Sequence, residues 1–456
     1  MSAERPWYRD HALHWGMLVA TWLRFLPMAT WPNQPCVRDE CTYLGLSSRI
    51  MNGEGMTQAA AGWLWAPGYP YLMALHDWVI GLPASVKVTQ TVIFLVSLVV
   101  VYRGMHGRFG KAAAAWSLWL LGLSPTLVFF GTSLWSEVFY TAILFFALFS
   151  LDWARKGGPE RGLVPGALVG VCVLFRGVAQ YMLPIFMLGL LWKRWREPGA
   201  WKGIGAMALA AALFVGPYSL SATERWGGFV LSDRTMGQMM WLGNNTFDPV
   251  TFDWGNGTLT KSGFNKLLRD GRDRCDKTEG PVAWDDCERQ GGVDHIKADP
   301  GQFAERIPLR LAQLMNPHSF LTRHLRWGKW KELPRWSREP LMVGTVVWSF
   351  LAIVCGTLGA FGRGRGWMLM VTGLIVAYHG AAISLLAGLS RYRVPLDAIW
   401  LLWAGAFLAA PRESLKLLVT DKWRLVGCVV ALAVFLPLML WFLPAGFPEW
   451  RSWSSS

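Results

Sequence analysis

The sequence predicts an all-α polytopic membrane protein. The chain of 456 residues is 53% hydrophobic and 16% charged, which is not the composition of an ordinary soluble domain. Charge-free apolar runs recur along it, and many approach the roughly 20 residues that a helix needs to cross a bilayer core of about 30 Å. Lipid offers no partner to unpaired backbone groups, so these runs are expected to be helical. The 29 Trp residues fit aromatic belts at the membrane interfaces.

We predict about eleven transmembrane spans. The first, 11–30, carries Arg24 and lacks a small-residue cleavage site, so we interpret it as a signal anchor. Segment 63–83 is apolar enough to cross, but a crossing there would place every later basic loop outside. We therefore predict that it is interfacial or re-entrant. The other spans are 84–102, 112–126, 132–151, 162–176, 178–192, 203–220, 341–361, 367–388, 394–411 and 425–443.

Loop charge predicts the orientation. Alternate connections collect most of the short-loop Lys and Arg, and the positive-inside rule makes that side cytoplasmic. We expect a multi-pass protein of the inner (plasma) membrane with a cytoplasmic N-terminus. The net charge of +14 largely reflects this bias, so the sequence argues against a nucleic-acid partner.

This topology divides the chain into three parts. Residues 1–220 form an N-terminal transmembrane module whose first external loop is 31–66. Residues 221–339 form an α-rich insert on the periplasmic side, with a helix pair broken at Pro300 and a basic, Trp-rich amphipathic helix over 323–338. Residues 340–456 supply the C-terminal transmembrane helices.

The cysteines agree with this division. Four of them lie in the external regions, and we predict the disulfides Cys36–Cys41 and Cys275–Cys287, because paired external cysteines suit an oxidising compartment. Neither pair has the short spacing expected of a zinc site.

Two acidic positions are candidates for chemistry. Asp39 and Glu40 follow the first span, and a carboxylate there can take a proton from an acceptor hydroxyl or amine. Their structural alternative is a helix N-cap or an ion pair with Arg38. Glu137 follows a charge-free stretch at the external end of the fourth span, where it could equally be a capping acid.

Cations on the same side could hold a phosphate. Arg176 lies alone between two apolar runs, and the alternative is that it snorkels to lipid headgroups. Arg391-Tyr392-Arg393 places two more guanidinium groups against the positive-inside trend. His379 lies within the ninth span and could be a ligand or a buried structural histidine.

The order of these motifs resembles the GT-C glycosyltransferases, polytopic enzymes that take sugars from polyprenyl-phosphate carriers. The resemblance rests on Asp39-Glu40 with Tyr43, on Pro67-Gly68-Tyr69-Pro70, on Ser136-Glu137, on Arg176, on Gly243-Asn244-Asn245, and on Arg391-Tyr392-Arg393-Val394-Pro395. It is closest in style to bacterial protein mannosyltransferases and the lipid A aminoarabinose transferase. An Arg-Asn pair usual after Pro217 in the family is absent.

The resemblance implies an inverting transfer on the periplasmic face from a polyprenyl monophosphate sugar to a lipid, protein or glycan acceptor. Asp39, Glu40 and Glu137 would be catalytic; Arg176, Arg391, Tyr392 and Arg393 would bind the donor phosphate; and Tyr43, Tyr69, Asn244, Asn245 and His379 would contact substrate. No cofactor is required, although Asp39 and Glu137 could hold a divalent cation.

Other classes stay open at this stage. A polyprenyl-linked lipid flippase or transporter would also have many spans, but would more often show repeats and midplane charges. An O-antigen polymerase or ligase would use external arginines without the first-loop carboxylates. A non-catalytic receptor or assembly subunit would bind a partner through the insert. No nucleotide-binding or hydrolase motif appears in a credible context.

Overall fold

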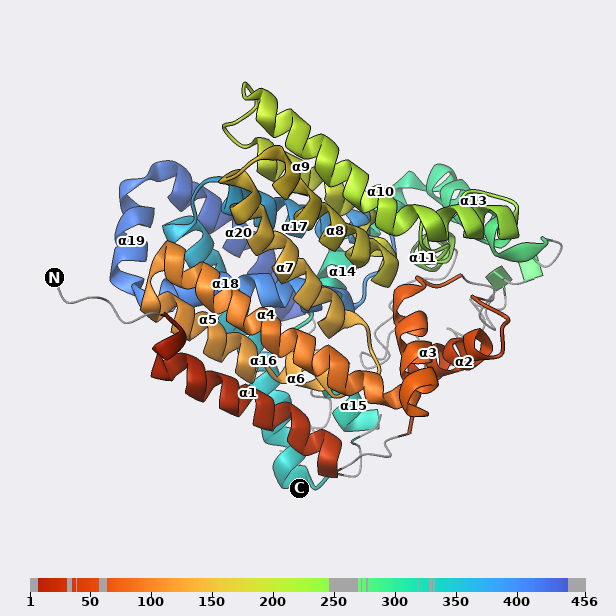
Figure 1. The fold of residues 1–456 in the computed structure, drawn as a ribbon, viewed down its shortest axis with the longest axis horizontal. Helices are drawn as coiled ribbons and strands as arrows, with labels where there is room; N and C mark the ends of the chain where they lie inside the picture. Colours follow the sequence, from red (N-terminus) through yellow and green to blue (C-terminus); the bar gives the residue numbers. More distant parts are fainter. Residues whose placement is uncertain are drawn as a thin grey trace.

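The computed structural model describes most of the chain and shows a helical membrane protein (Figure 1). The described residues are 7–30, 35–37, 39–56, 64–245, 270–271, 273–275, 278–318, 320–327, 330 and 333–441. Within them the structure has no β-strand, and extended pairing is limited to one isolated bridge between Leu64 and Arg234.

The described residues of the N-terminal half form ten α-helices with short 3₁₀ turns between some of them. After α1 come α2 and α3, which pack on each other. The α-helices are α1 (His11–Thr30), α2 (Asp39–Met51), α3 (Gly68–Ile80), α4 (Val86–Phe109), α5 (Lys111–Leu123), α6 (Pro125–Gly131), α7 (Glu137–Arg155), α8 (Leu163–Phe175), α9 (Met182–Leu191) and α10 (Pro198–Trp226), and the 3₁₀ turns are η1 (Trp7–Arg9), η2 (Pro83–Ser85), η3 (Pro159–Gly162) and η4 (Gly177–Tyr181).

The insert and the C-terminal part follow. In the insert, α11 packs on α13, and α14 reaches back to α17 and α20. The elements are α11 (Met236–Gly243), α13 (Gly280–Ala298), α14 (Pro300–Met315), α15 (Phe320–Trp327), α16 (Arg335–Arg363), α17 (Gly366–Leu385), η5 (Ser390–Arg393), α18 (Val394–Ala409), α19 (Pro411–Thr420) and α20 (Lys422–Trp441). The predicted helix break at Pro300 is confirmed, because α13 ends at Ala298 and Asp299 caps α14 by accepting from the backbone N–H of Gln302 at 2.9 Å.

Each predicted span coincides with a helix, but fewer than eleven helices are long and apolar enough to cross a membrane. Among the described residues six helices meet that test, or up to eight if each bent pair, α5 with α6 and α18 with α19, is one span. Two of the predicted spans are shorter, because α8 and α9 have 13 and 10 residues and the chain breaks at Arg176 between them. Helix α1, the first predicted span, is not apolar enough to meet that test, because it carries two histidines and Arg24.

Two predicted elements outside the spans can also be compared with the structure. Segment 63–83 contains only the 13-residue α3, which is about 20 Å long at 1.5 Å per residue and too short for a full crossing. The amphipathic helix predicted over 323–338 is not continuous: α15 ends at Trp327 and α16 begins at Arg335, directly after Pro334. Proline disfavours a helical conformation at the residue before it, so Pro334 separates α16 from the preceding segment.

Small residues allow the helices to pack closely. Gly162, Gly166 and Gly170 form a stripe on α8 and the turn before it, facing α10. A Cβ on Gly166 would lie 2.2 Å from the carbonyl oxygen of Met207, so a larger residue would force the two helices apart. Such small-residue stripes are a usual packing device where lipid removes the hydrophobic drive between helices.

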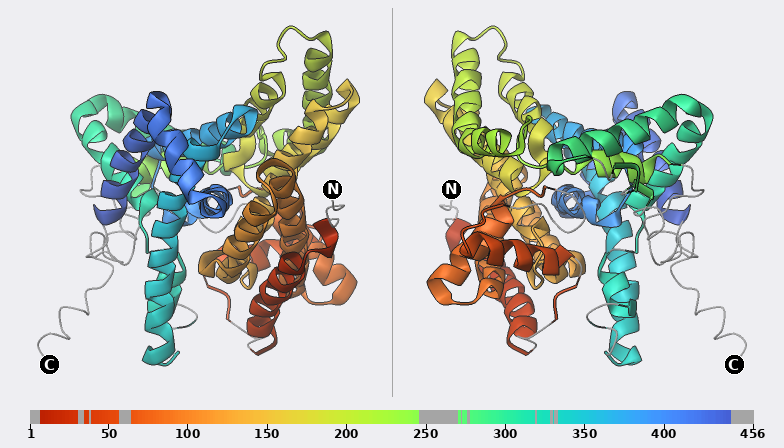
Figure 2. Two further views of the ribbon diagram at one scale, coloured as in Figure 1. Left: turned by 90° about the vertical axis from the view of Figure 1, so that its left-hand side faces the viewer. Right: turned by 90° about the vertical axis from the view of Figure 1, so that its right-hand side faces the viewer.

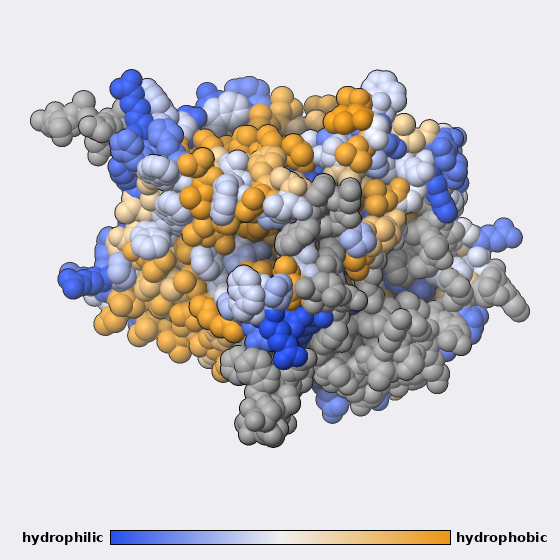
Figure 3. Space-filling view, turned by 90° about the horizontal axis from the view of Figure 1, so that it is seen from below, coloured by the Kyte–Doolittle hydropathy of each residue, from blue (hydrophilic) through white to orange (hydrophobic). Residues whose placement is uncertain are grey.

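The two halves of the chain lie side by side around the centre. Figure 2 shows the N-terminal helices, red to yellow, on one side, and α13 with the blue C-terminal helices on the other. Figure 3 shows broad hydrophobic areas on the surface of the protein, and large apolar side chains such as Leu213 (65% exposed) and Val430 (56%) point outward from α10 and α20. Exposed apolar faces of this extent are expected of a protein that lies in lipid.

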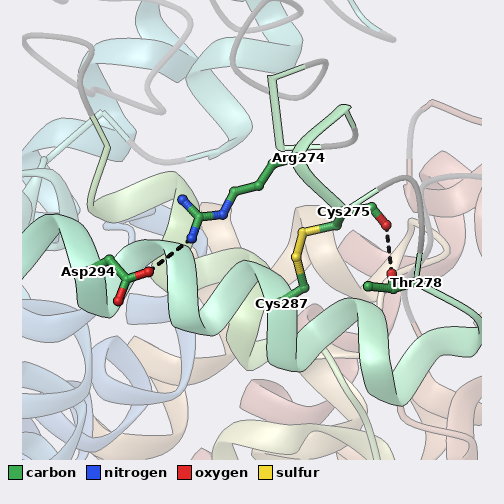
Figure 4. Close-up of a disulfide and its surroundings, with 5 residues drawn as sticks. All are labelled: Arg274, Cys275, Thr278, Cys287 and Asp294. Atoms are coloured by element: carbon green, nitrogen blue, oxygen red, sulfur yellow. Dashed lines mark hydrogen bonds and ion pairs between the residues drawn. A yellow bond between two sulfur atoms is a disulfide. The ribbon is translucent and has the colours of Figure 1, made fainter.

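Both predicted cysteine pairs are joined in the structure. Cys36 and Cys41 flank the start of α2, and Cys275 is bonded to Cys287 on α13 (Figure 4). The remaining cysteines, Cys172, Cys355 and Cys428, are free.

This pairing predicts the outcome of thiol labelling. The protein, purified without reductant and unfolded in alkylating reagent, should carry three labels, on Cys172, Cys355 and Cys428, because only free thiols react. Reduction before labelling should raise the number to all seven cysteines. Peptide mass spectrometry locates the labels, and a label on Cys36 or Cys275 in the unreduced sample would contradict the pairing.

Candidate active site

A single cavity joins the predicted site motifs. It has a volume of about 570 Å³ and is lined by residues of α2, η4, α11, the end of α17 and η5. We call it the central cavity. Five predicted site residues line it, namely Asp39, Tyr43, Arg176, Arg391 and Tyr392, and His379 is a sixth.

Asp39 and Arg391 form an ion pair on the cavity wall. Asp39 is the first residue of α2, and Arg391 lies in η5, 352 residues further along the chain. The guanidinium of Arg391 also lies over two aromatic rings, 5.4 Å from the centre of Trp135 and 5.3 Å from that of Tyr392. These contacts hold a charged group in place between the two halves of the molecule.

Glu137 and Arg176 form a second ion pair beside the first. The distance from Arg176 Nη1 to Glu137 Oε1 is 2.6 Å, and the Glu137 side chain is 1% exposed. Arg176 also donates to Ser136 Oγ at 3.3 Å, and the hydroxyl of Tyr43 lies 3.4 Å from the same atom. Arg176 lines the central cavity whereas Glu137 does not, so Glu137 holds the arginine from behind.

Of the two tyrosines predicted to contact substrate, Tyr43 lines the cavity and Tyr69 packs behind it. Tyr43 lines the cavity and makes edge contacts with Trp65 and Tyr69, whose ring centres are 5.0 and 4.9 Å away. Tyr69 is fully buried, and its hydroxyl donates to Gln90 Oε1 at 2.8 Å. We therefore revise Tyr69 from a substrate contact to a support for Tyr43.

His379 presents one ring nitrogen to the cavity region. Its Nδ1 lies 2.8 Å from the carbonyl oxygen of Ile375, one turn earlier in α17. This bond makes Nδ1 the protonated nitrogen and leaves Nε2 as an acceptor. Nε2 is buried and has no hydrogen-bond partner in the described part of the chain, so it is left as an unused acceptor.

Several polar residues that sequence reasoning missed also line the central cavity, among them Asp233 and Gln238. Asp233 precedes α11, and burial raises the pKa of its carboxyl group to about 6. Gln238 is fully buried. Neither stands in a recognisable motif, so the local sequence contains no signal that could have identified them.

The side chain of Glu40 binds backbone groups away from the cavity, so we revise its predicted catalytic role to a structural one. The side chain is fully buried and does not line the central cavity. One oxygen accepts from the backbone N–H of Val37 at 2.9 Å, and the other accepts from that of Leu134 at 2.8 Å. Glu40 thus ties the start of α2 to the segment before α7, which positions its neighbour Asp39.

Arg393 is also directed away from the cavity, so we revise its predicted phosphate-binding role. Its Nε lies 2.8 Å from Asp397 Oδ1, and Nη1 donates to the carbonyl oxygens of Met315 and Asn316 at 2.6 and 2.7 Å. Nη2 donates to Ser349 Oγ at 2.9 Å. The guanidinium is fully buried with these partners around it, so it fastens the end of α14 to α16 and α18.

Asn244 and Asn245 close α11 instead of lining the cavity, which revises their predicted substrate contact. The Asn244 amide donates to the carbonyl oxygens of Met240 and Leu385, both at 2.9 Å, and its oxygen accepts from Arg310 at 2.7 Å. The Asn245 amide donates to the carbonyl oxygen of Trp241 at 3.0 Å. The Asn244 side chain thus joins α11 to α14 and α17, whereas the amide of Asn245 caps the end of α11 itself.

The predicted cation site at Asp39 and Glu137 does not fit the structure. Each carboxylate is paired with its own arginine, and the described residues contain no group of three or more His, Cys, Asp or Glu side chains that could hold a metal. We therefore derive no step of the chemistry through a metal.

Comparisons with known proteins agree with this fold. Residues 64–222 match the family model of the Alg9-like mannosyltransferases. The apo structure of the Archaeoglobus fulgidus oligosaccharyltransferase matches with a TM-score of 0.50 at 14% identity, over 96% of this chain and 56% of that one. AglB from the same organism, solved with an inhibitory peptide and a dolichol-phosphate, gives 0.51 at 14% identity, over 95% and 56%. The chain thus spans little more than half the length of these archaeal proteins.

ArnT from Cupriavidus metallidurans bound to undecaprenyl phosphate aligns over 88% of this chain and 78% of its own, with a TM-score of 0.39 at 13% identity. No curated protein sequence matches the chain. The fold is similar to that of the archaeal oligosaccharyltransferase, and the family match over residues 64–222 agrees with the resemblance to GT-C glycosyltransferases found in the sequence.

The structural role of Arg393 can be tested with a double-mutant cycle. Arg393→Met leaves the Asp397 carboxylate buried without its partner, so it should lower the free energy of unfolding by about 3–5 kcal/mol. Replacing both residues, as Arg393→Met with Asp397→Leu, removes the orphaned charge and should recover a large part of this loss. Thermal unfolding of the purified protein in detergent measures both. A double variant no more stable than Arg393→Met would contradict the assignment.

Proposed function

We propose that this protein is an inverting glycosyltransferase that moves a sugar from a polyprenyl-phosphate carrier to an acceptor hydroxyl or amine. The observation that carries the proposal is the meeting of Asp39, Arg176 and Arg391 on one cavity wall. A fixed carboxylate beside two guanidinium groups supplies both a base and a binding site for a phosphate leaving group.

The donor phosphate binds Arg391 and Arg176. Phosphate accepts bidentate hydrogen bonds from arginine, so it competes with Asp39 for the Arg391 guanidinium. Donor binding therefore releases Asp39 into the cavity with its proton-accepting oxygens free. The prenyl chain continues along the apolar wall formed by the end of α17, where the lining includes Ala381, Ala382 and Leu385. The dolichol-phosphate in the AglB structure supports a lipid phosphate as ligand.

The reaction follows from this arrangement. The acceptor oxygen or nitrogen attacks the anomeric carbon from the face opposite the phosphate, and its proton passes to Asp39. The bond between the anomeric carbon and the phosphate oxygen breaks, and the electron pair leaves with the polyprenyl phosphate. Arg176 and Arg391 stabilise the charge that grows on this phosphate in the transition state, while Glu137 and Ser136 keep Arg176 in place.

The proposal also includes the side of the membrane on which the cavity opens and the class of acceptor. We infer that the cavity opens on the periplasmic side of the inner membrane, because the basic short loops predict the opposite side as cytoplasmic. The acceptor is a lipid, a protein or a glycan that reaches this side, and the insert 221–339, which supplies Asp233 and Gln238 to the cavity wall, lies against it. The external disulfides support an oxidising compartment.

Asp39→Asn tests the base. The amide cannot take the acceptor proton, so turnover should fall at least about 100-fold. It also competes less for Arg391, so the variant should bind polyprenyl phosphate at least as tightly as the wild type. Mass spectrometry of polyprenyl-phosphate lipids and surface glycans should show the donor accumulating and one modification lost, as in a deletion strain. Asp77→Asn, on the partly exposed α3, is the matched control. Near wild-type turnover in Asp39→Asn would reject the assignment.

Arg391→Lys tests the phosphate site. Lysine keeps the charge but loses the planar fork that binds a phosphate through two parallel hydrogen bonds. The apparent KM for the donor should rise about 10-fold or more, with the acceptor KM unchanged. Arg363→Lys, at the C-terminal end of α16 and away from the cavity, serves as the control. Steady-state kinetics with varied donor separates these effects, and an unchanged donor KM would contradict the proposed contact.

A further inference from the structure

Asp233 is a carboxylate on the cavity wall that the proposed mechanism does not use. Its Oδ2 accepts a hydrogen bond from Thr235 Oγ1 at 3.1 Å, and the described part of the chain gives it no ion pair. The carboxylate lies against Gly177: a Cβ on that residue would be 2.0 Å from Asp233 Oδ2. Asp39, the other carboxylate on this wall, is paired with Arg391.

Gln238 lies on the same wall with its hydrogen-bonding groups unused. The side chain is fully buried, and within the described residues neither its amide nitrogen nor its oxygen has a partner. Buried amides are nearly always hydrogen-bonded, so an unpaired one on a cavity wall calls for a specific explanation. A ligand that supplies the missing partners is such an explanation.

Asp285 holds the backbone beside these two residues. This residue of α13 accepts from the backbone N–H of Gly237 at 2.6 Å and lies 3.5 Å from Arg234 Nε. Arg234 also pairs with Asp286 at 2.9 Å, and its backbone N–H donates to the carbonyl oxygen of Leu64 at 2.8 Å. Arg234 and Gly237 are the chain neighbours of Asp233 and Gln238, so these contacts fix the backbone positions from which the two side chains extend.

From this geometry we infer that Asp233 and Gln238 bind the hydroxyl groups of the sugar being transferred and thereby set the donor specificity. The inference rests on the proposed function. A carboxylate and an amide together accept from and donate to hydroxyl groups, whereas a phosphate would be repelled by Asp233. Asp233 also lies against Gly177, the residue after Arg176. A sugar is covalently attached to the phosphate that Arg176 binds, so it extends to this wall.

The test measures how tightly the full chain in detergent binds a bare prenyl phosphate and the same phosphate carrying a sugar. The probes are a short-chain prenyl phosphate and a panel of the same phosphate carrying a hexose, a pentose or an amino sugar. The wild type should bind one loaded member at least about 10-fold more tightly than the bare phosphate. Asp233→Asn and Gln238→Leu should each lose most of that gain and keep the affinity for bare phosphate. Asp294→Asn and Gln290→Leu, on the exposed side of α13, are the matched controls.

A further variant leaves both recognition residues in place. Gly177→Ala adds a Cβ where the Asp233 carboxylate now lies, so it should also lose the gain for the loaded donor. Thr235→Val removes the hydroxyl that orients Asp233 and should have a smaller effect in the same direction.

Three outcomes would overturn the inference. Variants that keep the full preference for the loaded donor would show that these residues do not bind the sugar. Equal loss of bare-phosphate affinity would show a general structural defect, and a change confined to the acceptor KM would assign the pair to the acceptor. Failure of the proposed function is distinct from all three, because the wild type itself would then bind neither the bare phosphate nor any loaded donor.

Discussion

The structure depends on the hydrogen bonds and ion pairs that its buried arginine side chains form. A guanidinium in an apolar helix bundle requires a carboxylate or several carbonyl oxygens around it. Arg393 and Arg310 obtain complete sets from the protein, and these bonds fasten the insert to the C-terminal helices. Arg391 and Arg176 each have one carboxylate and a cavity beside them. This difference separates arginines that hold the fold from those that can receive a ligand.

Several features could be predicted from the sequence because they depend on local composition. Apolar length located the helices, and the acids and arginines that break the apolar runs pointed to Asp39, Arg176 and Arg391. Arg176 ends the apolar helix α8 and Arg391 lies just before the apolar helix α18, whereas Asp39 stands in the loop that follows α1. Among the described residues, fewer helices than the predicted spans are long and apolar enough to cross, because a helix such as α8 can be apolar throughout and still end after 13 residues.

The roles of residues that are close in sequence could not be predicted, because each role depends on the direction in which the side chain points. Arg391 and Arg393 are two residues apart in one 3₁₀ turn, yet the first lines the cavity and the second is fully buried beside Asp397. Asp39 and Glu40 diverge in the same way at the start of α2. Asp233 and Gln238 were missed entirely, since their position depends on Asp285, about fifty residues along the chain in α13.

The cysteine pair at the start of α2 has a consequence for how the protein matures. Asp39 lies between Cys36 and Cys41, inside the small covalent ring that their disulfide closes. On the proposed mechanism this ring adds a covalent restraint to the base, beside the Glu40 hydrogen bonds and the Arg391 ion pair that also position Asp39. A chain whose ring is reduced then folds with a less restrained base, so the thiol chemistry of the compartment in which the protein matures contributes to its activity.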